Sequence, residues 1–135
     1  MVRCPRRVAE SIRASARRAL PHEACGVVGG RREGDRLELS HWIELAPTDP
    51  AADAFAVDPV AFALAEARLR EEGANWLGFA HSHPHDEAVP SARDLDALWR
   101  SCLQVIVGGA ELRDVRAFWL HEAGAAALHW EESLP

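Results

Sequence analysis

The sequence predicts an α/β fold in which helices pack on one mixed β-sheet, built as a single domain over residues 1–135. Two observations predict this class. Short apolar runs of strand length alternate along the chain with amphipathic segments of helical length. A hydrophobic fraction of 48% also gives a chain of 135 residues enough apolar surface to bury one core without disulfides or a structural metal.

The N-terminal segment is predicted to be an amphipathic helix over residues 6–20. Its apolar residues recur every four positions, arginines fill the other faces, and Pro21 ends it. Residues 23–30 form a short apolar run closed by paired glycines, which indicates a buried strand. After a turn, residues 36–45 alternate in polarity and predict a strand with one face made of Leu37, Leu39, His41, Ile43 and Leu45.

The second half is predicted to contain two helices and four strands. The Pro- and Asp-rich connection at residues 46–59 is too irregular for an element, and a helix follows it with Pro59 at its start and Gly73 at its end. Residues 75–81 form a strand that leads into three histidines, and residues 91–102 form an amphipathic helix. The remaining strands are predicted at residues 103–109, 115–121 and 126–132.

Charge and cysteine content limit the kinds of partner. The formal net charge of −6 argues against nucleic acid or an anionic membrane surface as a partner. All 15 basic residues are arginines, which excludes Schiff-base lysines and the phosphate-binding lysine of a P-loop. Three separated cysteines and the lack of a continuous apolar signal segment favour a cytoplasmic location. Strand edges would permit a homodimer without requiring one.

A candidate metal site lies at the end of the strand predicted at residues 75–81. His81 and His83 are two residues apart, so their imidazoles project from the same face and could bind one ion. Pro84 then ends the hydrogen-bonding ladder, which leaves the pair at the edge of the sheet. An isolated pair of this kind is weak evidence, because two solvated or core histidines explain it equally well.

Asp94, in the first turn of the next predicted helix, could supply a third ligand. Two neutral imidazoles and one carboxylate would leave a zinc ion with an open fourth position, which is typical of catalytic sites. Helix capping explains the same segment without a metal, with Ser91 as the N-cap residue and Asp94 three positions later. Both interpretations stay open at this point.

Glu23 is the best candidate for the proton acceptor that a zinc hydrolase needs. It opens an otherwise apolar predicted strand, where a charge is costly unless it is paired or functional. The alternative is that Glu23 is only the solvated first residue of that strand.

Together these residues resemble the motif of the JAMM (MPN+) metallopeptidases. In that motif a His-Ser/Thr-His triplet is followed, after seven residues, by Ser-x-x-Asp, with a glutamate on an upstream strand. The stretches PHEACGVVGG, LGFAHSHP, PSARDL and LQVIVGG also resemble the family, so the resemblance covers nearly the whole chain. The match to the motif is complete: Glu23, His81, Ser82, His83, Ser91 and Asp94.

The resemblance implies a zinc-dependent peptidase or isopeptidase with a cytidine-deaminase-like α/β/α fold. By carry-over, one catalytic Zn²⁺ would be bound by His81, His83 and Asp94, with water as the fourth ligand. Glu23 would activate this water and return the proton to the leaving amine, and Ser91 would hydrogen-bond the zinc-bound water or the oxyanion.

The resemblance also implies a substrate class. The chain is too short for the insertions with which relatives that cleave ubiquitin chains hold two ubiquitins, and it resembles the small stand-alone prokaryotic members. These hydrolyse the amide bond after the C-terminal Gly-Gly of a ubiquitin-like or sulfur-carrier protein. The alternatives are a non-catalytic scaffold of the same fold and a JAMM-type hydrolase of unrelated small peptides. The connection at residues 46–59 lacks an asparagine that relatives often carry, so it does not define the substrate groove.

Three neighbouring residues are expected to lie outside the chemistry. Ser82 should point away from the metal, because side chains alternate along a strand. His85 occurs in an HxHxHD order, the reverse of the HxHxDH order of metallo-β-lactamase-like hydrolases, and is expected in a loop near the mouth of the site. Cys25 is expected to be a small core residue, with a redox or inhibitory contact to the metal as the alternative.

Overall fold

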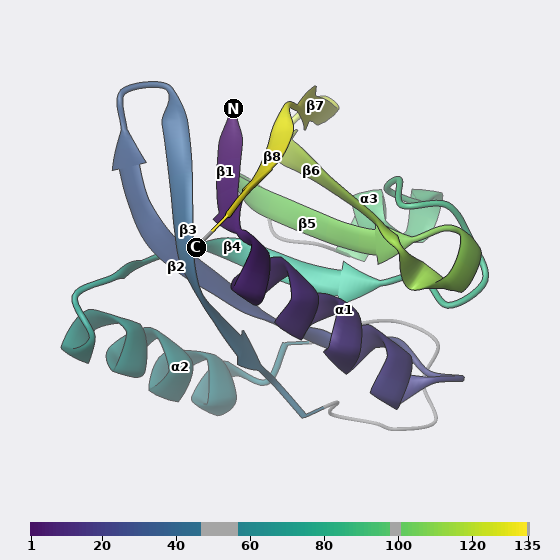
Figure 1. Cartoon of the computed structure of the whole chain (residues 1–135), viewed down its shortest axis with the longest axis horizontal. Helices are drawn as coiled ribbons and strands as arrows, with labels where there is room; N and C mark the ends of the chain where they lie inside the picture. The colour runs from purple at the N-terminus through teal and green to yellow at the C-terminus, as the bar shows by residue number, and fades with distance from the viewer. Residues whose placement is uncertain (47–56, 98–100, 135) are drawn as a thin grey trace.

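The computed structural model describes residues 1–46, 57–97 and 101–134, which form one mixed β-sheet with helices on both faces (Figure 1). The predicted α/β class is confirmed. Among these residues, no helix combines the length and apolar character that crossing a bilayer requires. The strands are β1 (Val2–Pro5), β2 (Cys25–Glu33), β3 (Arg36–Glu44), β4 (Asn75–Ser82), β5 (Cys102–Gly108), β6 (Asp114–His121), β7 (Gly124–Leu128) and β8 (Trp130–Ser133). The helices are α1 (Arg6–Ala19), α2 (Pro59–Glu71), α3 (Ala92–Ala97) and a 3₁₀ turn, η1 (Ala110–Leu112).

The centre of the sheet determines where a site can form. The strand order is β7-β6-β5-β4-β2-β3-β1-β8, so β4 lies between β2, to which it is antiparallel, and β5, to which it is parallel. Helix α3 lies in the connection between β4 and β5. The carboxyl ends of these two strands therefore meet at one edge, the position at which α/β sheets bind ligands. His81 is the penultimate residue of β4, and His83 follows directly after the strand.

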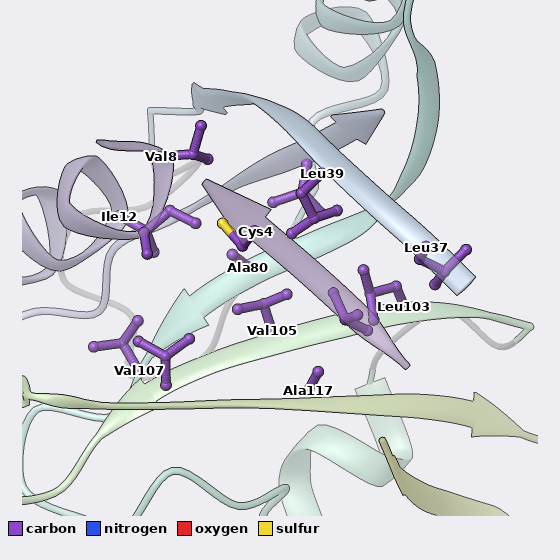
Figure 2. Packing of buried hydrophobic residues seen from close by; sticks show 14 of the residues in the cluster. Cys4, Val8, Ile12, Leu37, Leu39, Ala80, Leu103, Val105, Val107 and Ala117 are labelled. Carbon is purple, nitrogen blue, oxygen red and sulfur yellow. The ribbon is translucent and has the colours of Figure 1, made fainter. Parts of the chain in front are cut away.

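Helix α1 covers one face of the sheet and forms where the sequence predicts it. Val8, Ile12 and Ala16 recur every four residues on one side of the helix, and each is at most 4% exposed. They pack against side chains from the central and N-terminal strands (Figure 2). The strand residues labelled there include Cys4, Leu37, Leu39, Ala80, Leu103, Val105 and Val107.

Helix α2 covers the opposite face, on the side of the candidate site. The Asp58 side chain caps its first turn by accepting a hydrogen bond from the Ala61 N–H at 3.2 Å. The Phe62 ring of the helix packs on Phe79 of β4, with ring centroids 5.8 Å apart. Phe79 and His81 share a face of β4 because they are two residues apart, so α2 and the His81 imidazole lie on the same side of the sheet.

The structure corrects three predicted elements. β1 is a strand that the sequence pattern does not reveal, because four residues are too few to show alternation. The strand predicted at residues 126–132 is two strands, β7 and β8, which lie on opposite edges of the sheet. Cys102, predicted at the end of a helix, begins β5, and Ser101 before it has a φ of 58°, which breaks a right-handed helix. The rest of that predicted helix, residues 98–100, lies outside the described residues.

Strand β3 does not have the single apolar face that strict alternation predicts. Its pairing with β2 skips Ser40, which makes this residue the extra one of a β-bulge. One extra residue turns every later side chain to the other face of the sheet. Leu37 and Leu39 therefore pack in the cluster with α1, whereas Ile43 and Leu45 pack in the cluster with α2.

An ion pair ties α1 to the edge strand β8. The two terminal nitrogens of Arg13 donate to the two carboxylate oxygens of Glu132 at 3.0 and 2.6 Å. Trp130 Nε1 donates to the same carboxylate at 3.0 Å. The hydrogen bonds from Arg13 hold the pKa of Glu132 below its ordinary value of 4.5, although burial opposes this shift.

Replacing Glu132 with Gln should lower the free energy of unfolding by about 1–3 kcal/mol at neutral pH, because Arg13 loses a charged acceptor. A lowered folded-state pKa stabilises the protein at pH values above the unfolded-state pKa. The difference from wild type should therefore persist down to about pH 4.5 and vanish as the pH falls through the lower folded-state pKa. Urea unfolding at several pH values measures it.

The matched control for this prediction is Glu131→Gln. The Glu131 side chain is 43% exposed and lies 3.6 Å from Arg3, so its loss should cost less than about 1 kcal/mol at any pH. A Glu132→Gln loss that is unchanged in strong acid would contradict the role of the charge.

Candidate metal centre

Three buried side chains converge at the carboxyl end of β4. His81, His83 and Asp94 are 2%, 7% and 8% exposed. The Nε2 atoms of the two histidines are 3.2 Å apart, and Asp94 Oδ2 lies 3.2 Å from the first and 2.9 Å from the second. The histidines are therefore not independent solvated or core residues, because one carboxylate oxygen contacts both.

The central strands hold the two histidines in register. His81 pairs with Cys25 of β2 on one side and with Ile106 of β5 on the other. The N–H of His83 donates to the Val107 carbonyl at 2.8 Å and continues this contact beyond the end of β4. The backbone is thus fixed on both sides, and the two imidazoles point to the same face, as their spacing predicts.

A backbone carbonyl sets the tautomer of His83. Its Nδ1 lies 3.0 Å from the Glu87 carbonyl oxygen, which can only accept, so Nδ1 carries the proton. In the neutral ring, Nε2 then turns its lone pair toward Asp94, the arrangement of a metal-ligating histidine. Gly108 permits the loop to approach, because a Cβ there would lie 2.7 Å from the Asp86 carbonyl oxygen. The role of the Glu87 carbonyl is not visible in the sequence, since a backbone group has no residue-type signal.

Ser91 and Asp94 form the reciprocal cap that their spacing predicts. Ser91 Oγ accepts a hydrogen bond from the Asp94 N–H at 3.0 Å, and the Ser91 N–H donates to Asp94 Oδ2 at 3.0 Å. This Oδ2 is the atom that faces both histidines. Capping and ligation are therefore compatible, because the cap holds the carboxylate against the imidazoles.

The separations of these donors fit a tetrahedral zinc ion. Lone pairs on two imidazoles and a carboxylate oxygen repel one another unless protons or a metal cation lie among them. Zinc bonds of about 2.0–2.1 Å at tetrahedral angles separate ligand atoms by roughly 3.3–3.4 Å. The observed separations of 3.2, 3.2 and 2.9 Å are close to this value. Two nitrogens and one oxygen also leave a fourth position, as catalytic zinc sites do.

A second carboxylate, that of Glu23, lies beside the histidines. Glu23 is half-buried and lies two residues before the first residue of β2, Cys25. One of its carboxylate oxygens forms a group with ring nitrogens of His81 and His83, and these atoms all lie within 4.8 Å of one another. Both carboxylates could therefore act as a third ligand. Asp94 is the better candidate, because its Oδ2 is 2.9–3.2 Å from the imidazoles. The wider group around Glu23 suits a contact made through water.

Comparison with known proteins identifies the family. The family model for prokaryotic homologues of the JAB domain matches residues 5–121. The chain belongs to this family. The chain is 37% identical to a probable TtuB-protein conjugate cleaving protease of Thermus thermophilus. The match extends over 126 residues and covers 92% of this chain and 79% of that protein. The chain is also 30% identical to a desampylase of Haloferax volcanii. This match extends over 87 residues and covers 64% of this chain and 62% of that protein.

Solved structures share this fold. A Desulfitobacterium hafniense protein determined in solution is 33% identical, with a TM-score of 0.86 over 99% of this chain and 95% of that one. A structure described as a JAMM metalloprotease-like zinc site of the proteasome and signalosome has a TM-score of 0.58 over 98% of both chains, and its 16% identity shows the fold alone. The resemblance to the JAMM metallopeptidases is confirmed, and this JAB-family protein is a hydrolytic metallopeptidase.

The charges of this JAB-family site are strongly coupled. Burial alone would raise the pKa of Asp94, but hydrogen bonds from His81, His83 and the Ser91 N–H hold it well below its usual range. Burial lowers the pKa of His83, yet the Asp94 carboxylate and the Glu87 carbonyl outweigh burial and raise it. The Asp94 carboxyl group is therefore ionised near neutral pH, the state that a metal ligand requires.

Cys25 is a core residue next to the site, as expected. It is 4% exposed, and its thiol lies 3.5 Å from the Leu45 carbonyl oxygen, to which it donates. Burial, together with the charges of Glu44 and Glu23, raises its pKa to about 12. The thiol is therefore protonated and unreactive at neutral pH, which favours the packing role over a redox contact.

The other two neighbours, Ser82 and His85, make contacts with other parts of the chain. The Ser82 hydroxyl is occupied by the backbone of the neighbouring segment, because it accepts a hydrogen bond from the Ala24 N–H. His85 is exposed and lines an open hollow of about 480 Å³ beside the loop. The connection without the expected asparagine lies mostly outside the described residues, at 47–56.

Proposed function

We propose that this JAB-family protein is a cytoplasmic zinc isopeptidase that hydrolyses the amide bond after the C-terminal Gly-Gly of a ubiquitin-like or sulfur-carrier protein. The observation that carries the proposal is the convergence of two imidazole nitrogens and a carboxylate oxygen within 3.2 Å, with Glu23 beside them. The names of the Thermus conjugate-cleaving protease and of the desampylase support the substrate class. Three buried free thiols support the cytoplasmic location.

In this proposal His81, His83 and Asp94 hold the zinc ion. When bound, the ion supplies an electrophile that lowers the pKa of water and polarises the amide carbonyl. Glu23 accepts a proton from the attacking water and delivers it to the nitrogen of the leaving amine. The amide and water are thereby converted into a carboxylate on the terminal glycine and a free amine on the target.

Ser91 is proposed to stabilise the negative charge that develops on the amide oxygen. Its Oγ already accepts a hydrogen bond from the Asp94 N–H, so its own proton remains available for donation. Such a donor lowers the barrier most where water is excluded. Ser91 is exposed in the free protein, so bound substrate would provide this shielding.

Zinc analysis and a substrate panel test the proposal. The purified protein should hold about one zinc per chain, as a single catalytic site requires. It should cleave a synthetic isopeptide, in which a peptide ending in Gly-Gly is joined to the side chain of a lysine, faster than a linear peptide of the same composition. A folded protein without zinc would favour the scaffold alternative, and equal cleavage of both peptides would favour a general peptidase.

A further inference from the structure

Ser82 lies between the two histidines in sequence but contacts the segment that carries Glu23. The ladder between β2 and β4 ends where Cys25 pairs with His81. Beyond this point the Ser82 N–H donates to the Ala24 carbonyl at 3.0 Å, and the Ser82 hydroxyl accepts from the Ala24 N–H at 2.8 Å. A single residue thus bonds both backbone groups of Ala24, the residue next to Glu23.

This contact is buried. Ser82 is 1% exposed and Ala24 is 7% exposed, so water cannot easily replace the hydroxyl. An amide N–H that loses its acceptor in such a place must either shift or remain unsatisfied, and both are unfavourable. Glu23 itself lies before β2 and outside its ladder. The Ser82–Ala24 contact therefore extends the fixed part of the backbone to the residue beside Glu23.

We propose that Ser82 is a positioning residue whose hydroxyl sets the place of the Glu23 carboxylate relative to the two histidines. The inference rests on the proposed function, in which Glu23 moves the proton. His81, Ser82 and His83 form one continuous segment, so the imidazoles and the contact to Ala24 move together. Displacing Ala24 would move Glu23 against the imidazoles, and a misplacement of about 1 Å can cost roughly 100-fold in rate.

Kinetics of Ser82 variants on the synthetic Gly-Gly–lysine isopeptide test this role. Ser82→Ala should lower kcat roughly 10- to 100-fold, with KM and zinc content nearly unchanged. Ser82→Thr keeps the hydroxyl and should recover most of the rate. In a Glu23→Gln background, Ser82→Ala should have no further effect, because the group that it positions can no longer accept a proton. If Ser82→Ala does not fold, Ser82→Cys, with a weaker acceptor of similar size, replaces it.

Ser15→Ala is the matched control for the loss of a buried serine hydroxyl. Ser15 is 2% exposed in α1, and its hydroxyl accepts hydrogen bonds from Trp42 and Arg18 at 3.2 Å each. Its loss should lower the melting temperature without lowering kcat.

Hydrogen exchange of the Ala24 amide, measured by NMR, tests the contact without a substrate. Ser82→Ala should accelerate the exchange of this amide roughly 10-fold or more, and Ser82→Thr should leave it unchanged.

Each other outcome overturns a distinct part of the account. The inference is overturned if Ser82→Ala leaves the exchange of the Ala24 amide unchanged. It is also overturned if Ser82→Ala keeps the wild-type kcat while Glu23→Gln is inactive. Both results leave the proposed function intact. The inference is also overturned if Ser82→Ala loses zinc in proportion to its loss of rate, because Ser82 would then act on the metal ligands. It is overturned as well if Ser82→Ala lowers the rate equally in the Glu23→Gln background, because Ser82 would then act on the fold and not through Glu23. A fully active Glu23→Gln variant overturns the proposed function and this inference with it.

Discussion

Glu23→Gln should lower kcat on the Gly-Gly–lysine isopeptide by roughly 10²- to 10⁴-fold, the range that the loss of a general base costs. Glutamine keeps the shape of the side chain but cannot accept the proton of water. The closest donor atoms come from His81, His83 and Asp94, so the variant should keep its zinc. Steady-state kinetics on protein whose zinc content has been measured checks both expectations.

Glu44→Gln is the matched control for this variant. Glu44 is also an acidic residue close to Cys25, but its side chain is 45% exposed and pairs with Arg18 at 3.6 Å. Because exposed ion pairs contribute little, its loss should change kcat by less than about twofold. If Glu23→Gln retained full activity, Glu23 could not be the general base.

Asp94→Asn should weaken zinc binding by more than about 100-fold, because even the loss of a group that only orients a ligand costs 10- to 100-fold. The amide oxygen of asparagine can still accept the Ser91 N–H, so the helix cap persists while the anionic ligand is lost. Competition with a chromogenic chelator measures the affinity. The zinc-free variant should unfold at a lower temperature than the zinc-free wild type, because the hydrogen bonds from His81 and His83 to the charged carboxylate are lost as well. The zinc affinity therefore separates ligation from capping.

Asp86→Asn provides the control, since Asp86 is an exposed carboxylate of the neighbouring loop. It should bind zinc as the wild type does. Wild-type affinity in Asp94→Asn would mean that Asp94 only caps α3, the interpretation that its sequence spacing alone leaves open.

The candidate site is readable from the sequence because its geometry is local. The spacing of His81 and His83 on a strand fixes their common face, and the spacing of Ser91 and Asp94 fixes a cap. Such patterns depend on a few residues and not on the rest of the fold. Helix α1 is predicted by its unbroken periodicity, helix α2 by the proline at its start and the glycine at its end, and strand β4 by its short apolar run.

The features that the sequence does not reveal depend on contacts between distant segments. The bulge at Ser40 is defined only by the pairing of β3 with β2. The short strand β1 is defined by pairing with β3 and β8, and the edge strand β8 by pairing with β1. The Glu87 carbonyl that orients His83 is a backbone group, and side-chain patterns do not encode it. The extent of the domain over residues 1–135, the roles of the site residues and a homodimer stay predictions.

Hydrolysis of the Gly-Gly–lysine isopeptide in water enriched in heavy oxygen, with mass analysis of both products, tests the central claim most directly. The zinc-loaded protein should release the unmodified lysine peptide and a peptide ending in Gly-Gly whose new carboxylate carries one heavy oxygen from water. Zinc-free protein and Glu23→Gln should release neither at a comparable rate. Cleavage at another bond, or cleavage that is undiminished without zinc, would contradict a zinc isopeptidase acting through Glu23.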